Sequence, residues 1–304
     1  MQSKAAALRA ALGHRWPADV ILVWHLGMLK LVPFLRTGGA RVVLYLHGIE
    51  GWRSPGPVER ALLRKVDLFL SNSDYTWQRF LQFHPGQVNS RHRTVPLGIG
   101  TPLEQPQVPQ HAPRVLTLGR AMREELYSKG HREMILCWPR VVAAIPEARL
   151  DVAGPGDLIE EFRDLVRNLH LSDSVTVWGA VTEEKKETLF AECRVFALPS
   201  MGEGFGLVYL EAMRRGRPCV VGHADAGREV VVPPKCGESA DPQDPAALAE
   251  VLIRLLADRE SWRLKSEAAT FRYNRDYSAS AFQQRIRRAL NHSGGALCPA
   301  ISTV

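Results

Sequence analysis

The chain of 304 residues lacks the features that would assign it to a disulfide-rich, zinc-binding or membrane-spanning class. It has only five cysteines, which are widely scattered and form no C-x-x-C pair: Cys137, Cys193, Cys219, Cys236 and Cys298. Such spacing argues against a disulfide framework and a zinc site, and it predicts reduced, mostly buried thiols in a cytosolic protein. No run approaches the ~18 uninterrupted apolar residues that a membrane span requires.

Several catalytic signatures are also absent. The sequence contains no Walker A loop and no G-x-S-x-G elbow. The segment Gly154-Pro155-Gly156 fails as a dinucleotide fingerprint, because Ile159 stands where G-x-G-x-x-G needs its third glycine. The N-terminal residues have helical propensity without a long apolar core, so we expect no secretory signal.

What is present is the composition of a globular protein with an uneven charge. Hydrophobic residues make up 45% and charged residues 23%, and the length suffices for two domains. Residues 1–100 carry 13 Lys or Arg against 5 Asp or Glu, so they account for the whole net charge of +7. Two interpretations of this basic excess are equally consistent with the sequence. One is a solvated basic face, and the other is attraction to anionic lipid headgroups or to a phosphorylated acceptor. No basic stripe with interleaved aromatics indicates nucleic acid.

Strand-like and helix-like segments alternate on both sides of a proline-rich stretch. Residues 101–113 hold four prolines and few apolar residues, which predicts a linker. The predicted strands are 20–24, 41–46, 68–71, 115–118, 148–152, 174–177, 195–198 and 218–221. The predicted helices are 28–35, 58–65, one from 74, 133–144, 158–169, 183–192, one after 206, 245–257 and 279–290. The alternation predicts α/β domains with parallel sheets, at residues 1–105 and 106–276, followed by a helix and tail at 277–304 that pack back toward the first domain.

The most informative motif places Glu203 and Glu211 around a glycine-bracketed turn. A strand-like run precedes Gly204-Phe205-Gly206-Leu207 and a helix follows it, so the turn lies at the carboxyl end of a parallel strand, where open α/β sheets bind ligands. The backbone amides of this turn and of the helix start suit a phosphate, whereas carboxylates accept hydrogen bonds from sugar hydroxyls. Glutamates and glycines are also ordinary at helix starts. Taken as a ligand site, the motif indicates a nucleotide sugar.

The segment around these glutamates resembles the E-x7-E region of the retaining glycosyltransferases of family 4. The resemblance continues through Arg217-Pro218-Cys219 and Ala226-Gly227-Arg228-Glu229 and covers roughly residues 18–290. It implies the GT-B fold, in which two Rossmann-like parallel-sheet domains face a cleft. It also implies that Glu203 positions the sugar, that Glu211 holds the ribose, and that the Gly204–Leu207 amides meet phosphate or sugar.

The resemblance assigns further roles to residues at other strand ends. Arg120 and Lys129 would clamp the donor diphosphate, although a pair of solvated loop cations is the plainer interpretation and the intervening loop is longer than usual. His47 would contact the reacting sugar or orient the acceptor, with His25 a weaker candidate. Gly154 would lie near the nucleotide and Gly179 near the base.

The implied enzyme moves a hexose, with retention, from a UDP or GDP sugar to the hydroxyl of a carbohydrate or lipid-linked acceptor. With cationic side chains for the diphosphate and no D-x-D pair, we expect neither a metal nor a cofactor. Retention implies no dedicated side-chain base. We expect a cytoplasmic protein with peripheral contact at the inner face of an anionic membrane.

One departure from the family pattern concerns the first domain. Only 17 residues precede the segment that begins at Ala18 and holds the first strand, so the glycine-rich loop usual before it has no counterpart. This predicts an unpaired sheet edge, and with it self-association or a second chain that completes the acceptor site. It also motivates the alternative of a non-catalytic GT-B-like nucleotide-binding subunit. A glycoside phosphorylase is disfavoured, because no cofactor-lysine segment is present. The donor base, the sugar and the acceptor are not readable from the sequence.

Overall fold

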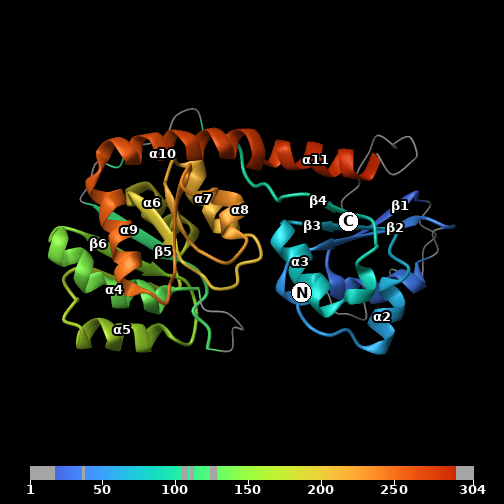
Figure 1. The fold of residues 1–304 in the computed structure, drawn as a ribbon, viewed down its shortest axis with the longest axis horizontal. Coiled ribbons are helices and arrows are strands. Elements are labelled where there is room, and N and C mark those ends of the chain that lie inside the picture. Colours follow the sequence, from blue (N-terminus) through green and yellow to red (C-terminus); the bar gives the residue numbers. More distant parts are fainter. Residues whose placement is uncertain (1–17, 36–37, 104–108, 110–112, 124–128, 292–304) are drawn as a thin grey trace. The chain divides into compact units, whose positions relative to one another are not determined.

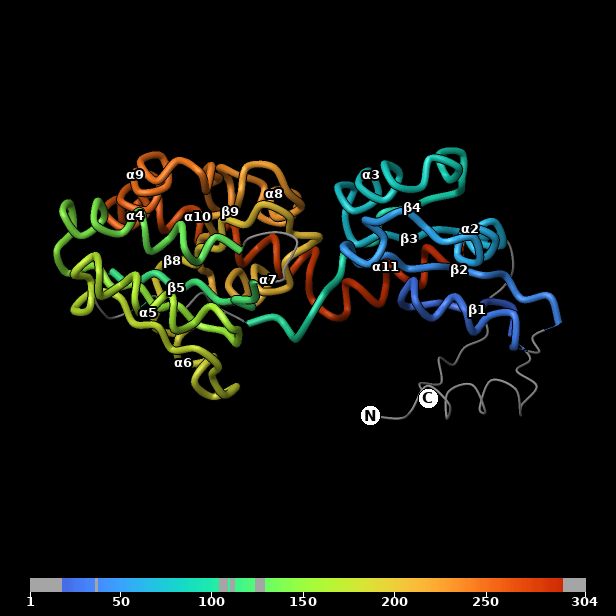
Figure 2. The backbone as a smooth tube through the Cα atoms, turned by 90° about the horizontal axis from the view of Figure 1, so that it is seen from below, coloured from blue at the N-terminus to red at the C-terminus, as the bar shows by residue number. Residues whose placement is uncertain are grey.

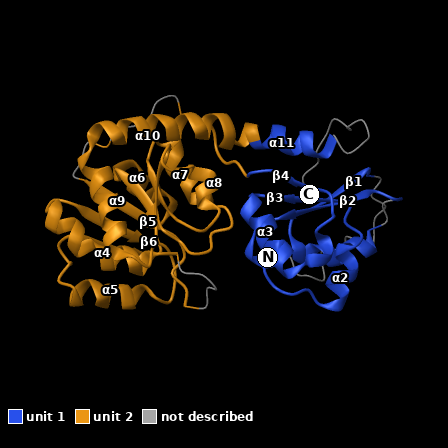
Figure 3. Ribbon diagram, in the orientation of Figure 1, with its two compact units in different colours: residues 1–96, 282–304 blue, residues 97–281 orange. Residues whose placement is uncertain are grey.

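The chain forms two compact units, each built on a parallel sheet (Figures 1 and 3). The structure is a computed structural model that describes residues 18–35, 38–103, 109, 113–123 and 129–291. Unit 1 comprises residues 1–96 and 282–304, and unit 2 comprises residues 97–281. Most of the predicted linker, the lengthened loop after Arg123, the first 17 residues and Cys298 lie outside the described residues.

The sheet of unit 1 has four strands in the order β1-β2-β3-β4, all parallel, and Figure 2 shows them following one another across the unit. Leu44 of β2 pairs with Val23 on one side and Phe69 on the other. The elements are β1 (Val20–Val23), η1 (Leu26–Phe34), β2 (Arg41–Leu46), η2 (Ile49–Gly51), α2 (Pro57–Leu63), β3 (Leu68–Ser71), α3 (Asp74–Phe83), η3 (Pro85–Gln87) and β4 (His92–Thr94).

The predicted helix at 28–35 is a 3-10 helix, η1, that begins two residues earlier. Pro33 lies inside it, and proline in an α-helix removes an amide donor and clashes with the carbonyl four residues back. Both ends of η1 have hydrogen bonds of the 3-10 type, in which an amide donates to the carbonyl three residues earlier. Met28 N donates to His25 O at 2.9 Å, and Leu35 N donates to Val32 O at 3.1 Å. His25 caps the helix, since its Nδ1 accepts from Gly27 N at 3.0 Å.

The sheet of unit 2 has six parallel strands in the order β10-β9-β8-β5-β6-β7. Its strands are β5 (Arg114–Leu118), β6 (Arg149–Ala153), β7 (Val175–Gly179), β8 (Val195–Leu198), β9 (Cys219–Gly222) and β10 (Gly237–Ala240). Its helices are α4 (His131–Ala144), α5 (Ile159–Asn168), α6 (Glu183–Glu192), α7 (Leu207–Arg214), α8 (Gly227–Val231), α9 (Pro245–Ala257), α10 (Arg259–Arg272) and η4 (Tyr273–Tyr277). The final helix, α11 (Ala279–Asn291), starts in unit 2 and continues in unit 1.

Helices cover both faces of the unit 2 sheet, because its strands are apolar on both sides. In β8, Val195 and Ala197 join the core formed with α4, α5 and α9, whereas Phe196 and Leu198 join the core formed with α6, α7 and α8. All four side chains are at most 1% exposed. This period of two with both faces buried is the pattern of a central strand in a doubly covered sheet. The two α/β parallel-sheet units confirm the predicted fold class.

The last helix is tied to the unit 1 sheet by arginines. Arg41 donates to Leu290 O at 3.3 Å and Arg93 donates to Ala289 O at 3.1 Å. Carbonyls in the last turn of a helix have no partner within the helix, so these contacts satisfy them. The compact units divide after Pro96 and again after Ala281. The predicted boundaries, 105/106 and 276/277, remain an interpretation of the sequence.

Candidate active site

The sequence-predicted donor residues of unit 2 lie at the carboxyl edge of one parallel sheet. Gly119 and Arg120 follow β5, Gly154 follows β6 and Gly179 ends β7. Backbone hydrogen bonds join these ends, from Gly119 N to Ala153 O at 3.1 Å and from Gly154 N to Gly179 O at 2.8 Å. Neighbouring strand ends therefore form one continuous rim, where α/β sheets bind ligands.

Gly154 is required by the rim itself. Its φ of 128° lies in the region that favours glycine, and a Cβ there would stand 1.8 Å from Gly119 O. The loop before Arg120 and the loop after β6 can approach each other only because this position has no side chain. Gly154 thus shapes the rim, whatever contact it makes with a nucleotide.

Lys129 and Glu203 are brought together from loops 74 residues apart. Lys129 Nζ donates to Glu203 Oε2 at 2.9 Å, and the two side chains are 19% and 17% exposed. Each charge therefore retains access to solvent, and the ion pair can open to a ligand. A cation beside a carboxylate offers one group for a phosphate and one for a hydroxyl.

The turn that follows Glu203 is held by a side-chain hydrogen bond, a left-handed glycine and a buried aromatic ring. Glu203 Oε1 accepts weakly from Phe205 N at 3.4 Å, and Gly206 adopts φ 85° as the N-cap of α7. The Phe205 side chain is buried against Tyr277, whereas Leu207 is 43% exposed. Phe205 can therefore meet a ligand only through its backbone.

The sequence analysis missed Asp225, which anchors this turn from the loop after β9. Its Oδ2 accepts from Ser200 Oγ and, at 3.0 Å, from Glu203 N, while its Oδ1 accepts from Gly227 N at 2.9 Å. The residue is 4% exposed, and burial raises the pKa of its carboxyl to about 6. Asp225 lies 22 residues after Glu203, and no motif around it in the sequence indicates this contact.

The raised pKa of Asp225 predicts a loss of activity in mild acid. As pH falls through about 6, the carboxylate takes up a proton and Oδ2 becomes a weaker acceptor for Glu203 N. The contribution of Asp225 to folding stability depends on pH in the opposite direction. Because the folded pKa exceeds the ordinary 3.8, that contribution is largest below 3.8 and is lost as pH rises to about 6.

Profiles of kcat/KM from pH 5 to 8 test this for the wild type and for Asp225→Asn. We expect the wild type to lose activity near pH 6. The variant should be lower at pH 8 by about 10-fold or more, as for a lost hydrogen bond to a charged group, and should not show that inflection. Superimposable profiles for the two proteins would remove Asp225 from this role.

Arg120 and Lys129 line one cavity of about 590 Å³, which also extends along α5. Arg123 and Arg132 add positive charge to it, and Glu161 and Asp164 add negative charge. Glu203 and Glu211 are not among its described lining residues. The structure therefore joins Arg120 to Lys129 through a shared cavity, and Lys129 to Glu203 through an ion pair.

A buried histidine fixes the strand end next to Arg120. His131 is 3% exposed; its Nε2 lies 3.2 Å from Gly119 O and its Nδ1 lies 3.0 Å from Thr117 Oγ1. Burial lowers the pKa of His131 to about 4, so the ring is neutral at physiological pH. With one ring proton, Nε2 donates to the carbonyl and Nδ1 accepts from the hydroxyl.

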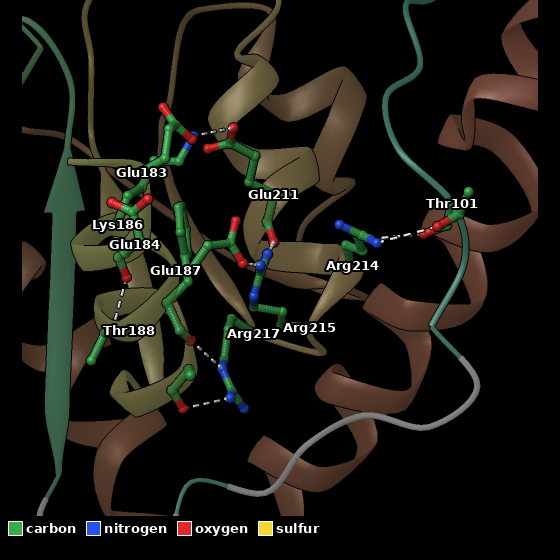
Figure 4. Close-up of polar contacts among 12 residues, drawn as sticks. Thr101, Glu183, Glu184, Lys186, Glu187, Thr188, Glu211, Arg214, Arg215 and Arg217 are labelled. Carbon is green, nitrogen blue, oxygen red and sulfur yellow. Dashed lines mark hydrogen bonds and ion pairs between the residues drawn. The ribbon is translucent and has the colours of Figure 1, made fainter.

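Glu211 has a partner of its own on a neighbouring helix. Lys186 Nζ of α6 lies 3.1 Å from Glu211 Oε1, as Figure 4 shows. The carboxylate is 27% exposed. No hydrogen bond between Glu211 and Lys129 or Glu203 is found within the described residues. Glu211 and Glu203 thus belong to two separate clusters of unit 2.

His47 and His25 belong to unit 1. His47 follows β2, its Nε2 lies 2.6 Å from Trp24 O, and its backbone amide donates to Glu50 Oε1 at 2.6 Å. Asn72 holds the His47 carbonyl at 2.6 Å. These contacts place an oriented histidine at the carboxyl edge of the first sheet.

Within the described residues, no group of three or more His, Cys, Asp or Glu side chains is arranged as a metal site. In the same part of the chain, no helix is both long and apolar enough to pass through a bilayer.

The chain is similar to known glycosyltransferases in sequence and to solved structures in fold. Residues 112–258 match the family described as Glycosyl transferases group 1. A GDP-mannose-dependent alpha-(1-6)-phosphatidylinositol monomannoside mannosyltransferase of Mycobacterium tuberculosis is 28% identical over 269 residues, which cover 80% of this chain and 68% of that protein.

Solved structures share the fold across nearly the whole chain. A sucrose-phosphate synthase from Thermosynechococcus elongatus matches with a TM-score of 0.72 at 24% identity, covering 95% of this chain and 76% of that one. Anabaena HepE in complex with UDP and glucose matches with a TM-score of 0.72 at 18% identity, covering 95% and 81%. These likenesses confirm the predicted GT-B fold.

Proposed function

We propose that this chain, a glycosyltransferase of GT-B fold whose residues 112–258 match the group 1 glycosyltransferases, transfers mannose from GDP-mannose to a hydroxyl of a glycolipid. The observation that carries the proposal is the Lys129–Glu203 ion pair of 2.9 Å directly before α7. The choice of donor is supported by the mycobacterial relative, which is a GDP-mannose-dependent mannosyltransferase.

In this proposal the donor is held along the carboxyl edge of the unit 2 sheet. Lys129 and Arg120 neutralise the diphosphate, and the start of α7 at Gly206 and Leu207 adds backbone amides. Glu203 meets hydroxyls of the sugar, and Glu211 meets the ribose. Gly154 and Gly179 bring the rim backbone close to the nucleotide.

The chemistry follows from these charges. Negative charge grows on the diphosphate as the bond to the sugar breaks, and a fixed ammonium next to it stabilises that charge. Lys129 and Arg120 supply this stabilisation, so we propose a metal-independent reaction. The acceptor hydroxyl attacks from the side of the leaving phosphate, which takes the proton and gives retention. We assign contact with the acceptor to His47 of unit 1.

The acceptor side is proposed to work at an anionic membrane surface. Residues 1–100 hold 13 Lys or Arg against 5 Asp or Glu. Unit 1 also exposes apolar side chains around β1 and η1, with Trp24 39%, Met28 50% and Phe34 46% exposed. Basic and apolar groups together suit the headgroup region. Self-association through the edge strand β1 remains a prediction.

A donor panel tests the proposal. GDP-mannose, GDP-fucose, UDP-glucose and ADP-glucose are each incubated with the protein, phosphatidylinositol mannosides and saturating EDTA, and product is followed by mass spectrometry. We expect mannose transfer from GDP-mannose alone, undiminished by the chelator. Transfer only from a UDP or ADP sugar would overturn the donor assignment. Activity that disappears with EDTA and returns with Mg²⁺ would overturn the metal-independent mechanism.

A further inference from the structure

Lys186 lies between two carboxylates that come from different elements. Its Nζ is 2.7 Å from Glu183 Oε2, one turn earlier on α6, and 3.1 Å from Glu211 Oε1 on α7 (Figure 4). The Lys186 side chain is 18% exposed, whereas Glu183 is 80% exposed. The contact to Glu183 is an ordinary surface pair three residues apart, but the contact to Glu211 links two helices.

The position of Lys186 relates it to the rim of the sheet. The chain runs from Gly179 at the end of β7 through Thr182, the N-cap of α6, to Lys186 in the first turns of that helix. Lys186 therefore lies on the helix that follows Gly179, the strand end proposed to face the base. It contacts Glu211, whose carboxylate is proposed to face the ribose.

Lys186 keeps its charge in this setting. Burial alone would lower the pKa of Lys186, but its hydrogen bonds to Glu183 and Glu211, together with their charges, outweigh burial and raise that pKa. The lysine is thus a permanent cation that fixes one oxygen of Glu211. Among the described residues no hydrogen bond to the other oxygen, Oε2, is found.

We propose that Lys186 is a positioning residue of the donor site, which holds Glu211 so that Oε2 accepts a hydrogen bond from the ribose 2′-hydroxyl of the nucleotide. This inference rests on the proposed function, because it needs a nucleotide sugar in unit 2. A carboxylate with one oxygen tied and one open has a defined direction, and a directed acceptor discriminates between a hydroxyl and its absence.

The consequence is selection for ribose over 2′-deoxyribose. A ligand that lacks the hydroxyl leaves the Glu211 acceptor unpaired, and a directed hydrogen bond to a charged group is worth about 10-fold or more in affinity. Without Lys186, Glu211 is free to rotate into solvent. Its unpaired charge then also repels the diphosphate.

The test compares GDP with 2′-deoxy-GDP by isothermal titration calorimetry. We expect the wild type to bind GDP about 10-fold more tightly than the deoxy analogue, and Lys186→Met to reduce this ratio to about 2-fold. Lys185→Met is the matched control. It removes the same charge from the preceding residue of α6, whose ammonium lies 3.8 Å from the centroid of the Trp178 ring and, among the described residues, makes no hydrogen bond or ion pair with Glu211.

Each outcome has a distinct meaning. A collapsed ratio in Lys186→Met, with Lys185→Met unchanged and Lys186→Arg largely restored, supports the inference. An unchanged ratio in Lys186→Met overturns it while leaving the proposed function intact. If the wild type itself fails to bind GDP, the proposed function fails first. Unfolding midpoints of all variants show whether a change in ratio accompanies a loss of fold.

Discussion

Lys129→Ala should weaken GDP binding about 10- to 100-fold and leave guanosine binding unchanged. The range corresponds to the loss of a hydrogen bond between charged groups. Lys129 is held at 2.9 Å from Glu203 with a 19% exposed side chain, so its ammonium is both oriented and reachable. Guanosine has no phosphate and gains nothing from the ammonium. Calorimetric titration of the two ligands measures the difference, and equal losses for both would remove Lys129 from the diphosphate.

A double variant separates two causes of that loss. Lys129→Ala removes a cation from the phosphate, but it also leaves Glu203 as an unpaired carboxylate that is only 17% exposed. In Lys129→Ala with Glu203→Gln, the repulsive charge is gone as well. If direct contact with phosphate dominates, the double variant binds GDP as weakly as the single one. Recovery of wild-type GDP affinity in the double variant would assign the effect to the uncovered carboxylate.

Gly206→Ala should abolish transfer and lower stability, although it adds one methyl group. Gly206 has φ 85°, a conformation that costs other residues about 1–2 kcal/mol. Its Cβ would lie 2.3 Å from Tyr209 Cδ2 and 3.2 Å from Glu203 Cγ. Tyr209 cannot yield, because it is fully buried and donates to Leu198 O at 2.6 Å. The turn must therefore move, and Glu203 moves with it.

The matched control is Gly86→Ala, because a Cβ at Gly86 meets nothing within 4 Å and its φ is not in the left-handed region. We expect at least a 100-fold loss of kcat/KM for Gly206→Ala, from a shift of about 1 Å at the site, and a lower midpoint of thermal unfolding. The control should match the wild type in both measurements. Wild-type kcat/KM in Gly206→Ala would show that the turn is not part of the site.

The central elements of both sheets were predictable from local patterns. Arg41–Leu46, Leu68–Ser71 and Val195–Leu198 are short apolar runs, and the structure has these strands with the predicted bounds. Two helices, Glu183–Glu192 and Pro245–Ala257, also match, because Thr182 and Asp244 provide clear N-caps. Apolar runs and capping residues act over a few positions, so one sequence is enough to find them.

Elements without such signals were missed. The edge strand Gly237–Ala240 contains Gly, Glu and Ser and has no apolar run. The helix Arg259–Arg272 carries charges on most of its exposed positions, and its buried face includes the polar Ser266 between Trp262 and Ala269. Its apolar periodicity is therefore too weak to predict a helix. In each case, packing against the rest of the unit decides the structure.

The site shows the same division between local and long-range information. Glu203 and Gly206 belong to one recognisable turn, whereas Lys129, 74 residues before Glu203, was assigned to the same site only through the family resemblance. Asp225 and Lys186 could not, because their contacts with Glu203 and Glu211 join residues 22 and 25 positions apart. Such pairs arise only when the parallel strands bring consecutive loops to one edge.

The anomeric configuration of the product shows whether the protein transfers mannose with retention. GDP-α-mannose labelled with ¹³C at the anomeric carbon is incubated with the protein and a phosphatidylinositol mannoside, and the one-bond carbon–proton coupling of the new linkage is measured by NMR. We expect a mannose linked through the α configuration, formed without added metal. A β-linked product would contradict retention, and release of free mannose without transfer would contradict the proposed transferase activity.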